Sequence, residues 1–179
     1  PNFSVSSPRC VNNQLTFTNL STPAAGSTLK KYYWNFGDGS PQVVDTTGNP
    51  QTHTYTTPGV YVVSLVAESN TGCQSPADTM QLTIHPKPVP DFTYTGICLP
   101  VATQFNSTST ISDGTQAGFI YAWTFGDGGT AGNTATPTHV YAAGGPYNVQ
   151  LTVTSNNGCV DSVTKPVAVI YAQPIAAFN

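Results

Sequence analysis

Charge is scarce in this sequence, and that scarcity excludes whole classes of function. Asp, Glu, Lys and Arg together make up 7% of the 179 residues, against about 25% in an ordinary soluble domain. Only Lys30 and Lys31 adjoin among the five basic residues, whereas binding to nucleic-acid phosphates needs clustered positive charge. No apolar run approaches the roughly 20 residues of a membrane span. We therefore expect neither a nucleic-acid partner nor membrane insertion.

Catalytic groups are equally sparse. The eight acidic residues comprise seven aspartates and the single Glu68. They form no recurring pair of carboxylates suited to acid–base work, and no Ser/His/Asp set has the sequence context of a nucleophile elbow. The sequence predicts that this chain is not an enzyme and carries no cofactor.

Strand patterns fill the chain instead. Tyr147, Val149, Leu151 and Val153 alternate with polar residues, which is the period of a strand with one buried face. A matching set stands earlier in the chain at Tyr61, Val63, Leu65 and Ala67. Further inward-facing sets are expected at Tyr32, Trp34 and Phe36, at Tyr121, Trp123 and Phe125, and at Leu15, Phe17 and Phe105. Short strands separated by frequent turns predict an all-β, antiparallel sandwich.

The sequence is also a tandem repeat. Trp34-Asn35-Phe36-Gly37-Asp38-Gly39 recurs 89 residues later (123 − 34) as Trp123-Thr124-Phe125-Gly126-Asp127-Gly128. Asn70-Thr71-Gly72-Cys73 recurs as Asn156-Asn157-Gly158-Cys159, with the offset shortened to 86 (159 − 73). The shortening places a deletion in the loop around residues 41–51, where a change of length is tolerated.

These offsets predict two domains and the beginning of a third. The first repeat is expected over residues 1–86 and the second over 87–173, with 174–179 starting a third copy or overhanging as a strand. Phe178 lies 86 residues after Phe92 (178 − 92), so we expect the natural protein to continue. Between the copies, Pro86-Lys87-Pro88 favours extended backbone and a short, stiff spacer.

The combined motif resembles the polycystic kidney disease (PKD) domain. Its elements are Trp-x-Phe-Gly-Asp-Gly, then His-Thr-Tyr at 53–55 or His-Val-Tyr at 139–141, then a Tyr-x-Val-x-Leu strand and Asn-x-Gly-Cys. The resemblance covers nearly the whole chain, once per copy, and implies two tandem immunoglobulin-like sandwiches. Asn35 and Thr124 stand where the family often has Asp, which weakens a metal site at that position. The cysteine layout is similar to that of bacterial copies in large repetitive cell-surface proteins.

The repeated Gly-Asp-Gly segments have two readings. The structural reading is a tight turn, in which glycines supply positive φ and the carboxylate accepts hydrogen bonds from nearby backbone amides. It covers Gly37, Asp38 and Gly39, and Gly126, Asp127 and Gly128. The alternative is a calcium ligand, but calcium takes six to eight oxygen ligands and each copy has few acids. We expect the turn, and likewise expect His53 and His139 to make structural hydrogen bonds.

Two further residue types have structural readings. Trp34 and Trp123 lie inside alternating strands, which favours a place in the core over a sugar-stacking platform. The cysteines show no metal spacing, and an even number favours disulfides and an oxidising compartment. Repeat symmetry predicts pairing within each copy, Cys10 with Cys73 and Cys98 with Cys159; an exchange between copies is the alternative.

The tandem copies are the basis of three hypotheses for the function of this chain. The primary hypothesis is a rigid extracellular or cell-surface spacer or adhesive element of a large surface protein or filament, whose partners are neighbouring repeats and a cell-surface, polysaccharide or protein ligand. The alternative is a substrate-binding module of a secreted hydrolase, for which an exposed row of aromatic side chains would be expected. A third hypothesis is self-assembly, with residues 175–179 adding a strand to a neighbour's sheet.

Overall fold

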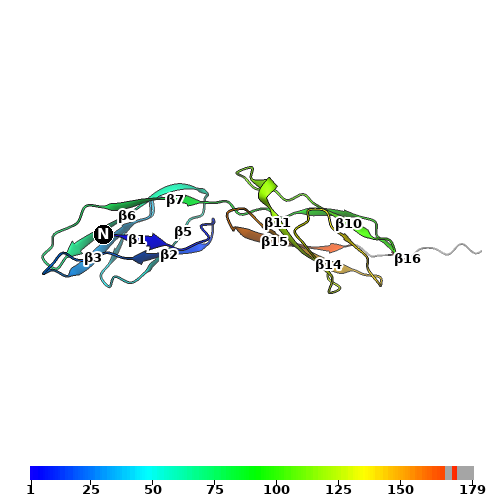
Figure 1. Ribbon diagram of the computed structural model, residues 1–179, viewed down its shortest axis with the longest axis horizontal. Helices are drawn as coiled ribbons and strands as arrows, with labels where there is room; N and C mark the ends of the chain where they lie inside the picture. The colour runs from blue at the N-terminus through cyan, green and yellow to red at the C-terminus, as the bar shows by residue number, and fades with distance from the viewer. Residues whose placement is uncertain (168–170, 173–179) are drawn as a thin grey trace, which may run out of the picture. The chain divides into compact units, whose positions relative to one another are not determined.

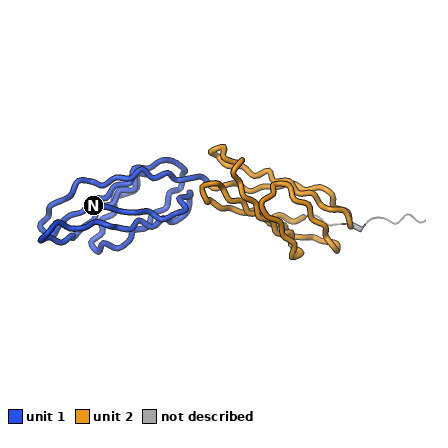
Figure 2. The backbone as a smooth tube through the Cα atoms, viewed as in Figure 1, with its two compact units in different colours: residues 1–86 blue, residues 87–179 orange. Residues whose placement is uncertain are grey.

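The computed structural model describes residues 1–167 and 171–172. The chain divides into two compact units, residues 1–86 and residues 87–179 (Figure 2). The segment 174–179, with Phe178 and the expected start of a third copy, lies outside the described residues.

Unit 1 is built from two antiparallel sheets (Figure 1). The smaller sheet has the strand order β1 (Phe3–Val5), β2 (Gln14–Asn19) and β5 (Gln51–Thr54). The larger has the order β4 (Val43–Asp45), β3 (Leu29–Asn35), β6 (Gly59–Ser69) and β7 (Asp78–Ile84).

Unit 2 repeats this plan. Its smaller sheet has the strand order β13 (Thr138–His139), β10 (Thr103–Ser107) and β8 (Phe92–Thr95). Its larger sheet has the order β12 (Thr130–Gly132), β11 (Ile120–Thr124), β14 (Tyr147–Thr154) and β15 (Val160–Val167). A short parallel pair joins β9 (Cys98–Leu99) to β16 (Tyr171–Ala172). One 3₁₀ turn, Gln116–Gly118, precedes β11. The expected all-β, immunoglobulin-like sandwich is confirmed in both units.

The core of each unit lies between its two sheets. In unit 1, Phe3, Leu15 and Phe17 from the smaller sheet meet Trp34 and Leu65 from the larger. Trp34 is fully buried and contacts the rings of Phe3 and Phe17 edge-on, with centroids 5.3 and 6.1 Å apart. Unit 2 reproduces this packing with Trp123 against Phe92 and Phe105. The alternation of apolar and polar residues in the sequence thus corresponds to burial of every second side chain. Such burial stabilises the fold by about 25 cal/mol per Å² of apolar surface.

The two tryptophans differ in one contact, and the loop of unequal length explains it. The Nε1–H of Trp123 donates to the carbonyl of Thr134 at 2.9 Å. Trp34 Nε1 is buried without a hydrogen-bond partner among the described residues. In unit 1 the corresponding loop is longer and folds around Asp45, whose carboxylate accepts from the backbone of Thr47 and Gly48. The insertion in copy 1 therefore satisfies its own backbone but supplies no carbonyl to the tryptophan.

Gly37 lies where the chain leaves β3 and crosses the start of β6. Its φ is +79°, and a Cβ there would overlap the backbone carbonyl of Val62. In unit 2, Gly126 has φ +85° and a Cβ would lie 2.7 Å from the carbonyl oxygen of Asn148. The third residue of each turn, Gly39 or Gly128, also has positive φ, but a Cβ added there would have no atom within 4 Å. The first glycine thus allows close backbone approach, and the second supplies only a left-handed conformation.

This difference gives a matched test. Gly37→Ala should lower the free energy of unfolding by about 3 kcal/mol or more, since the new methyl group meets fixed backbone. Gly39→Ala should cost about 1 kcal/mol, the price of left-handed backbone alone. Gly126→Ala and Gly128→Ala form the same pair in unit 2. Urea unfolding followed by tryptophan fluorescence measures all four, and equal losses within a pair would contradict the close approach.

Candidate functional site

The strongest polar feature in each unit is the turn that follows β3 or β11. In unit 1 the carboxylate of Asp38 accepts from the backbone N–H of Ser40 at 3.0 Å and from its hydroxyl at 2.6 Å. In unit 2 the carboxylate of Asp127 accepts from the backbone N–H of Gly129 at 2.9 Å. Each aspartate therefore closes its own turn.

A histidine from the smaller sheet reaches the same carboxylate. His53 Nε2 lies 2.6 Å from Asp38 Oδ2, and His139 Nε2 lies 2.7 Å from Asp127 Oδ2. An ionised carboxylate can only accept, so the imidazole Nε2–H is the donor. The Asp–His pair joins the turn of the larger sheet to a strand of the smaller one, in both copies.

Aromatic rings hold each imidazole in place. His53 stacks on Phe36 with centroids 4.1 Å apart and planes 6° apart, and it meets Tyr55 edge-on at 4.8 Å. The Tyr55 hydroxyl then donates to the carbonyl of Phe36 at 2.9 Å. In unit 2 the corresponding contacts of His139 are to Phe125 at 4.2 Å and to Tyr141 at 4.6 Å. A ladder of rings thus extends from the core tryptophan to the Asp–His pair.

The charge of the site is fixed by these contacts. Burial alone would raise the pKa of Asp38, but the hydrogen bonds from Ser40 and His53 outweigh it and lower the pKa to about 2. The pKa of Asp127 is likewise lowered: burial opposes this, and the bonds from His139 and the Gly129 backbone prevail. Burial and the neighbouring Asp38 charge raise the pKa of Tyr55, which stays a neutral donor.

This arrangement suits a structural clasp better than chemistry. Among the described residues, no serine, threonine or cysteine side chain hydrogen-bonds either imidazole, so the pair lacks a nucleophile to activate. Across the same part of the chain, no three His, Cys, Asp or Glu side chains gather as a metal site would require. Trp34 and Trp123 are buried at 0% and 1% exposure, away from any surface that could stack on a sugar.

The predicted pairing of cysteines within each copy is wrong. Cys73 and Cys98 are free, exposed thiols, whereas Cys10 and Cys159 are disulfide-bonded. Cys10 pairs with His85 at one end of the β6–β7 hairpin, and Cys73 lies in the turn at the other end. The seven residues of β7 separate them, which is roughly 20 Å at about 3.3 Å per residue. A disulfide needs Cα atoms within about 7 Å.

The same obstacle separates the cysteines of unit 2. Cys98 pairs with Tyr171, beyond the end of β15, and Cys159 lies in the turn before β15 begins. Repeat symmetry in the sequence reveals which cysteines are equivalent. It does not reveal that equivalent hairpins place the two cysteines of one copy at opposite ends.

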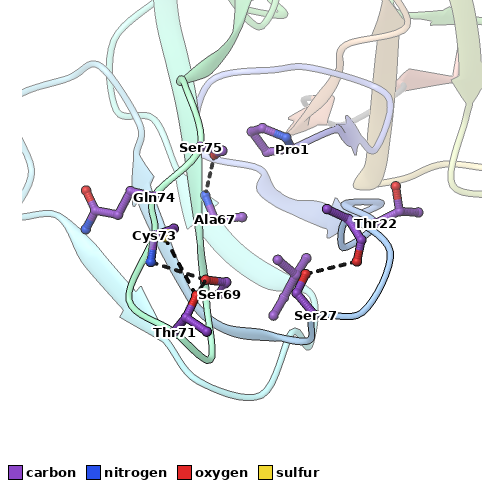
Figure 3. Close-up of a pocket in the computed structure, with 11 residues that line it drawn as sticks. Pro1, Thr22, Ser27, Ala67, Ser69, Thr71, Cys73, Gln74 and Ser75 are labelled. Atoms are coloured by element: carbon purple, nitrogen blue, oxygen red, sulfur yellow. Dashed lines mark hydrogen bonds between the residues drawn. The ribbon is translucent and has the colours of Figure 1, made fainter.

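A pocket of about 290 Å³ lies beside Cys73 in unit 1. Pro1, Thr22, Ser27 and Leu29 line one part of it, and the β6–β7 turn lines the rest. Figure 3 shows Thr71 and Cys73 together at one side of this pocket. No sequence motif singled out this hollow, because its lining comes from four separate segments.

The Asp–His pair predicts a loss of stability in acid. Since the pKa of Asp38 is lowered from 3.8 to about 2 in the folded state, its contribution is present above about pH 4 and is lost as the pH falls toward 2. Asp38→Asn should lower the free energy of unfolding by about 1 kcal/mol at pH 6, allowing for solvent screening. The free energy of unfolding of this variant should also fall less between pH 4 and pH 2 than that of the natural sequence. Urea unfolding at each pH measures this.

Asp113→Asn is the matched control, since it removes one negative charge from an exposed turn that touches no histidine. We expect this variant to keep the acid dependence of the natural sequence. If Asp38→Asn and Asp113→Asn behaved alike, the Asp–His pair would contribute nothing specific.

Known proteins share this fold and these motifs. The sequence pattern of the PKD domain matches residues 1–84 and again residues 85–170. Collagenase ColA of Clostridium perfringens is 42% identical over 59 residues, which is 33% of this chain and 5% of the collagenase. The matched part is thus a small fraction of that relative. Among the residues described here, no helix has the length and apolar character of a membrane span.

Two solved structures are similar to this chain. The PKD1 domain of the Vibrio cholerae metalloprotease PrtV is 31% identical with a TM-score of 0.41; the match covers 48% of this chain and 98% of that domain. A C-terminal fragment of intimin, solved with the intimin-binding domain of its receptor Tir, has a TM-score of 0.55 at 11% identity. That match covers 92% of this chain and 62% of the fragment, and it is a likeness of fold alone. With the two family matches covering nearly its whole length, this chain belongs to the PKD domain family, as two tandem copies.

Proposed function

We propose that this chain is a non-enzymatic, extracellular repeat segment that acts as a rigid spacer or adhesive element of a large secreted or surface protein or filament. The observation that carries the proposal is the site itself. The Asp–His cluster, which both copies share, uses its carboxylate and imidazole on each other and on their own turn. Nothing in it is left over for a substrate.

The distribution of aromatic side chains supports the same proposal. All large apolar side chains recorded as exposed are aliphatic, among them Val60 and Val62 on the outer face of β6 and Ile120 at the start of β11. No aromatic side chain whose burial is described is exposed. A module that binds polysaccharide by stacking would need exposed rings, which are the usual platform for sugars.

The chemistry of the cysteines and the family support an extracellular setting. Disulfide-bonded cysteines persist in oxidising compartments. PKD domains also occur in extracellular proteins such as collagenases. Low charge with many uncharged polar residues suits a surface that is solvated without attracting ions.

The second candidate function is that of an accessory module in a secreted hydrolase. Its support is the identity to collagenases of Clostridium perfringens and Bacillus cereus, at 42% and 46% over short segments. In those enzymes the PKD domain is a non-catalytic part of a larger chain. On this alternative, the present chain would hold an enzyme against an insoluble substrate.

A pull-down on insoluble collagen, chitin and cellulose separates the two candidates. The spacer proposal predicts that the chain stays in the supernatant at all concentrations, because the residues whose burial is described offer no exposed row of aromatic side chains. Saturable retention on any of the three would favour the accessory module. The outer face of β6 would then be the first surface to alter, by Val60→Ser and Val62→Ser.

Small-angle scattering tests the spacer more directly. With a stiff Pro86-Lys87-Pro88 connection, the chain should scatter as an extended particle, and Pro86→Gly with Pro88→Gly should broaden its distribution of lengths. A compact, folded-back pair in the natural sequence would contradict the proposal.

A further inference from the structure

The first and last long strands of unit 2 belong to different sheets. β8 lies in the smaller sheet beside β10, and β15 lies in the larger sheet beside β14. Residues 87–91 lead into β8, and the chain passes from β15 to β16 before it leaves the unit. A pull on the two ends of the chain therefore acts on β8 and on β15 with β16 before it reaches the rest of unit 2.

Lys165 of β15 joins these two strands through three contacts. Its Nζ donates to the carbonyl oxygen of Phe92 at 2.9 Å and forms an ion pair with the carboxylate of Asp91. The same Nζ lies 5.2 Å from the centre of the Phe92 ring. Lys165 stands opposite the buried Val149 in the register of β14 with β15. Its aliphatic stem therefore crosses from the larger sheet to the smaller one.

The strength of this join comes from its position more than from its charges. The hydrogen bond from Lys165 is the main cause that lowers the pKa of Asp91, which keeps the carboxylate ionised. The ion pair is partly exposed, and such pairs contribute little to equilibrium stability. The bond to the carbonyl of Phe92 is charge-assisted and holds a residue whose ring is buried in the core.

A second join lies further along the same two segments. β9 pairs in parallel with β16, with Cys98 opposite Tyr171. The separation in sequence is 73 residues there (171 − 98) and again 73 residues between Phe92 and Lys165 (165 − 92). The Lys165 contact thus continues the register of the parallel pair. Opposite pulls on the two segments would shear both joins at once.

Unit 1 has a backbone join of the same kind. The N–H of Val11 donates to the carbonyl of His85, and the N–H of His85 donates to the carbonyl of Arg9, at 2.9 and 2.8 Å. These bonds tie the segment after β1 to the residue that follows β7. They correspond to the pairing of β9 with β16 in unit 2.

Different side chains stand in unit 1 at the positions of the lysine contact. Met80 takes the place of Lys165 in the register of β7 with β6, and Asn2 takes the place of Asp91 before the first buried phenylalanine. A thioether and an amide carry no charge and form no ion pair. The two copies therefore differ in how their first and last strands are joined.

We propose that Lys165 is a mechanical latch that holds the first strand of unit 2 to the last when the chain is under tension, so that unit 1 yields first. This inference rests on the proposed spacer function, because a spacer transmits force through its two ends. Graded strength gives such a spacer a weaker unit, which unfolds and lengthens the chain before the stronger unit is lost.

Force-clamp measurements on single molecules of the full chain, held by its two ends, test the latch. A reductant is present so that disulfides carry none of the load. We expect two unfolding events with different lifetimes, the longer belonging to unit 2. Lys165→Met installs the residue that unit 1 carries. It should shorten the longer lifetime about tenfold, the effect of about 1.4 kcal/mol on the barrier, and leave the shorter lifetime unchanged.

Two further variants keep this test specific. Thr164→Met is the matched control, because it adds the same side chain at an exposed position of β15. It should leave both lifetimes unchanged. Asp91→Asn removes the ion pair but keeps the bond from Lys165 to the carbonyl of Phe92, so it should shorten the longer lifetime less than Lys165→Met does. If Lys165→Met left both lifetimes unchanged, or if Thr164→Met shortened the longer one as much, the latch would be overturned.

Unfolding in urea separates a latch from ordinary stabilisation, because a denaturant loads no particular contact. The rate of unfolding in urea, followed by tryptophan fluorescence, should differ about twofold or less between the natural sequence and Lys165→Met. An effect in urea as large as the effect under tension would make the contact a general stabilising one and overturn its mechanical role.

The latch and the spacer can fail separately. Retention on collagen, with a lifetime that Lys165→Met still shortens, would overturn the spacer and leave the latch as a property of unit 2. Equal lifetimes for the natural sequence and Lys165→Met, in a chain that is extended in solution and binds no substrate, would overturn the latch alone.

Discussion

Packing of one tryptophan against two phenylalanines holds each repeat together. Trp34 lies on the central strand of the larger sheet, and Phe3 and Phe17 reach it from the smaller one, so this contact joins the two sheets. Burial of such rings is the largest apolar contribution that a small sandwich possesses. The rest of the repeat extends from it: Phe36 stacks on Trp34, His53 on Phe36, and the Asp–His pair ends the ladder at the surface.

The same ladder explains why the polar motif has no catalytic character. The imidazole of His53 stacks on Phe36 and meets Tyr55 edge-on. One of its nitrogens, Nε2, is hydrogen-bonded to Asp38. Its role is to orient the turn that lets Gly37 pass the backbone of Val62. A histidine and an aspartate that recur in each copy thus serve the geometry of the sandwich.

Much of this could be predicted from the sequence, for identifiable reasons. A period of two at Val149, Leu151 and Val153 reports burial on one face, which needs no knowledge of distant contacts. The disulfide pairing could not be predicted in this way. Equivalence of Cys10 with Cys98 is visible in the sequence, but their distance from Cys73 and Cys159 depends on the length of a hairpin and on which end the chain leaves. The pocket beside Cys73 was invisible for the same reason, since its lining comes from segments that only folding brings together.

A double-mutant cycle between Asp38 and His53 is the most direct measurement on the central claim, that the ladder of rings ends in a structural Asp–His pair. Urea unfolding at pH 6 compares the natural sequence with Asp38→Asn, His53→Gln and the double variant. The account predicts a coupling energy of about 1 kcal/mol, because each single change removes the same contact. Losses in the free energy of unfolding that simply add would contradict the account.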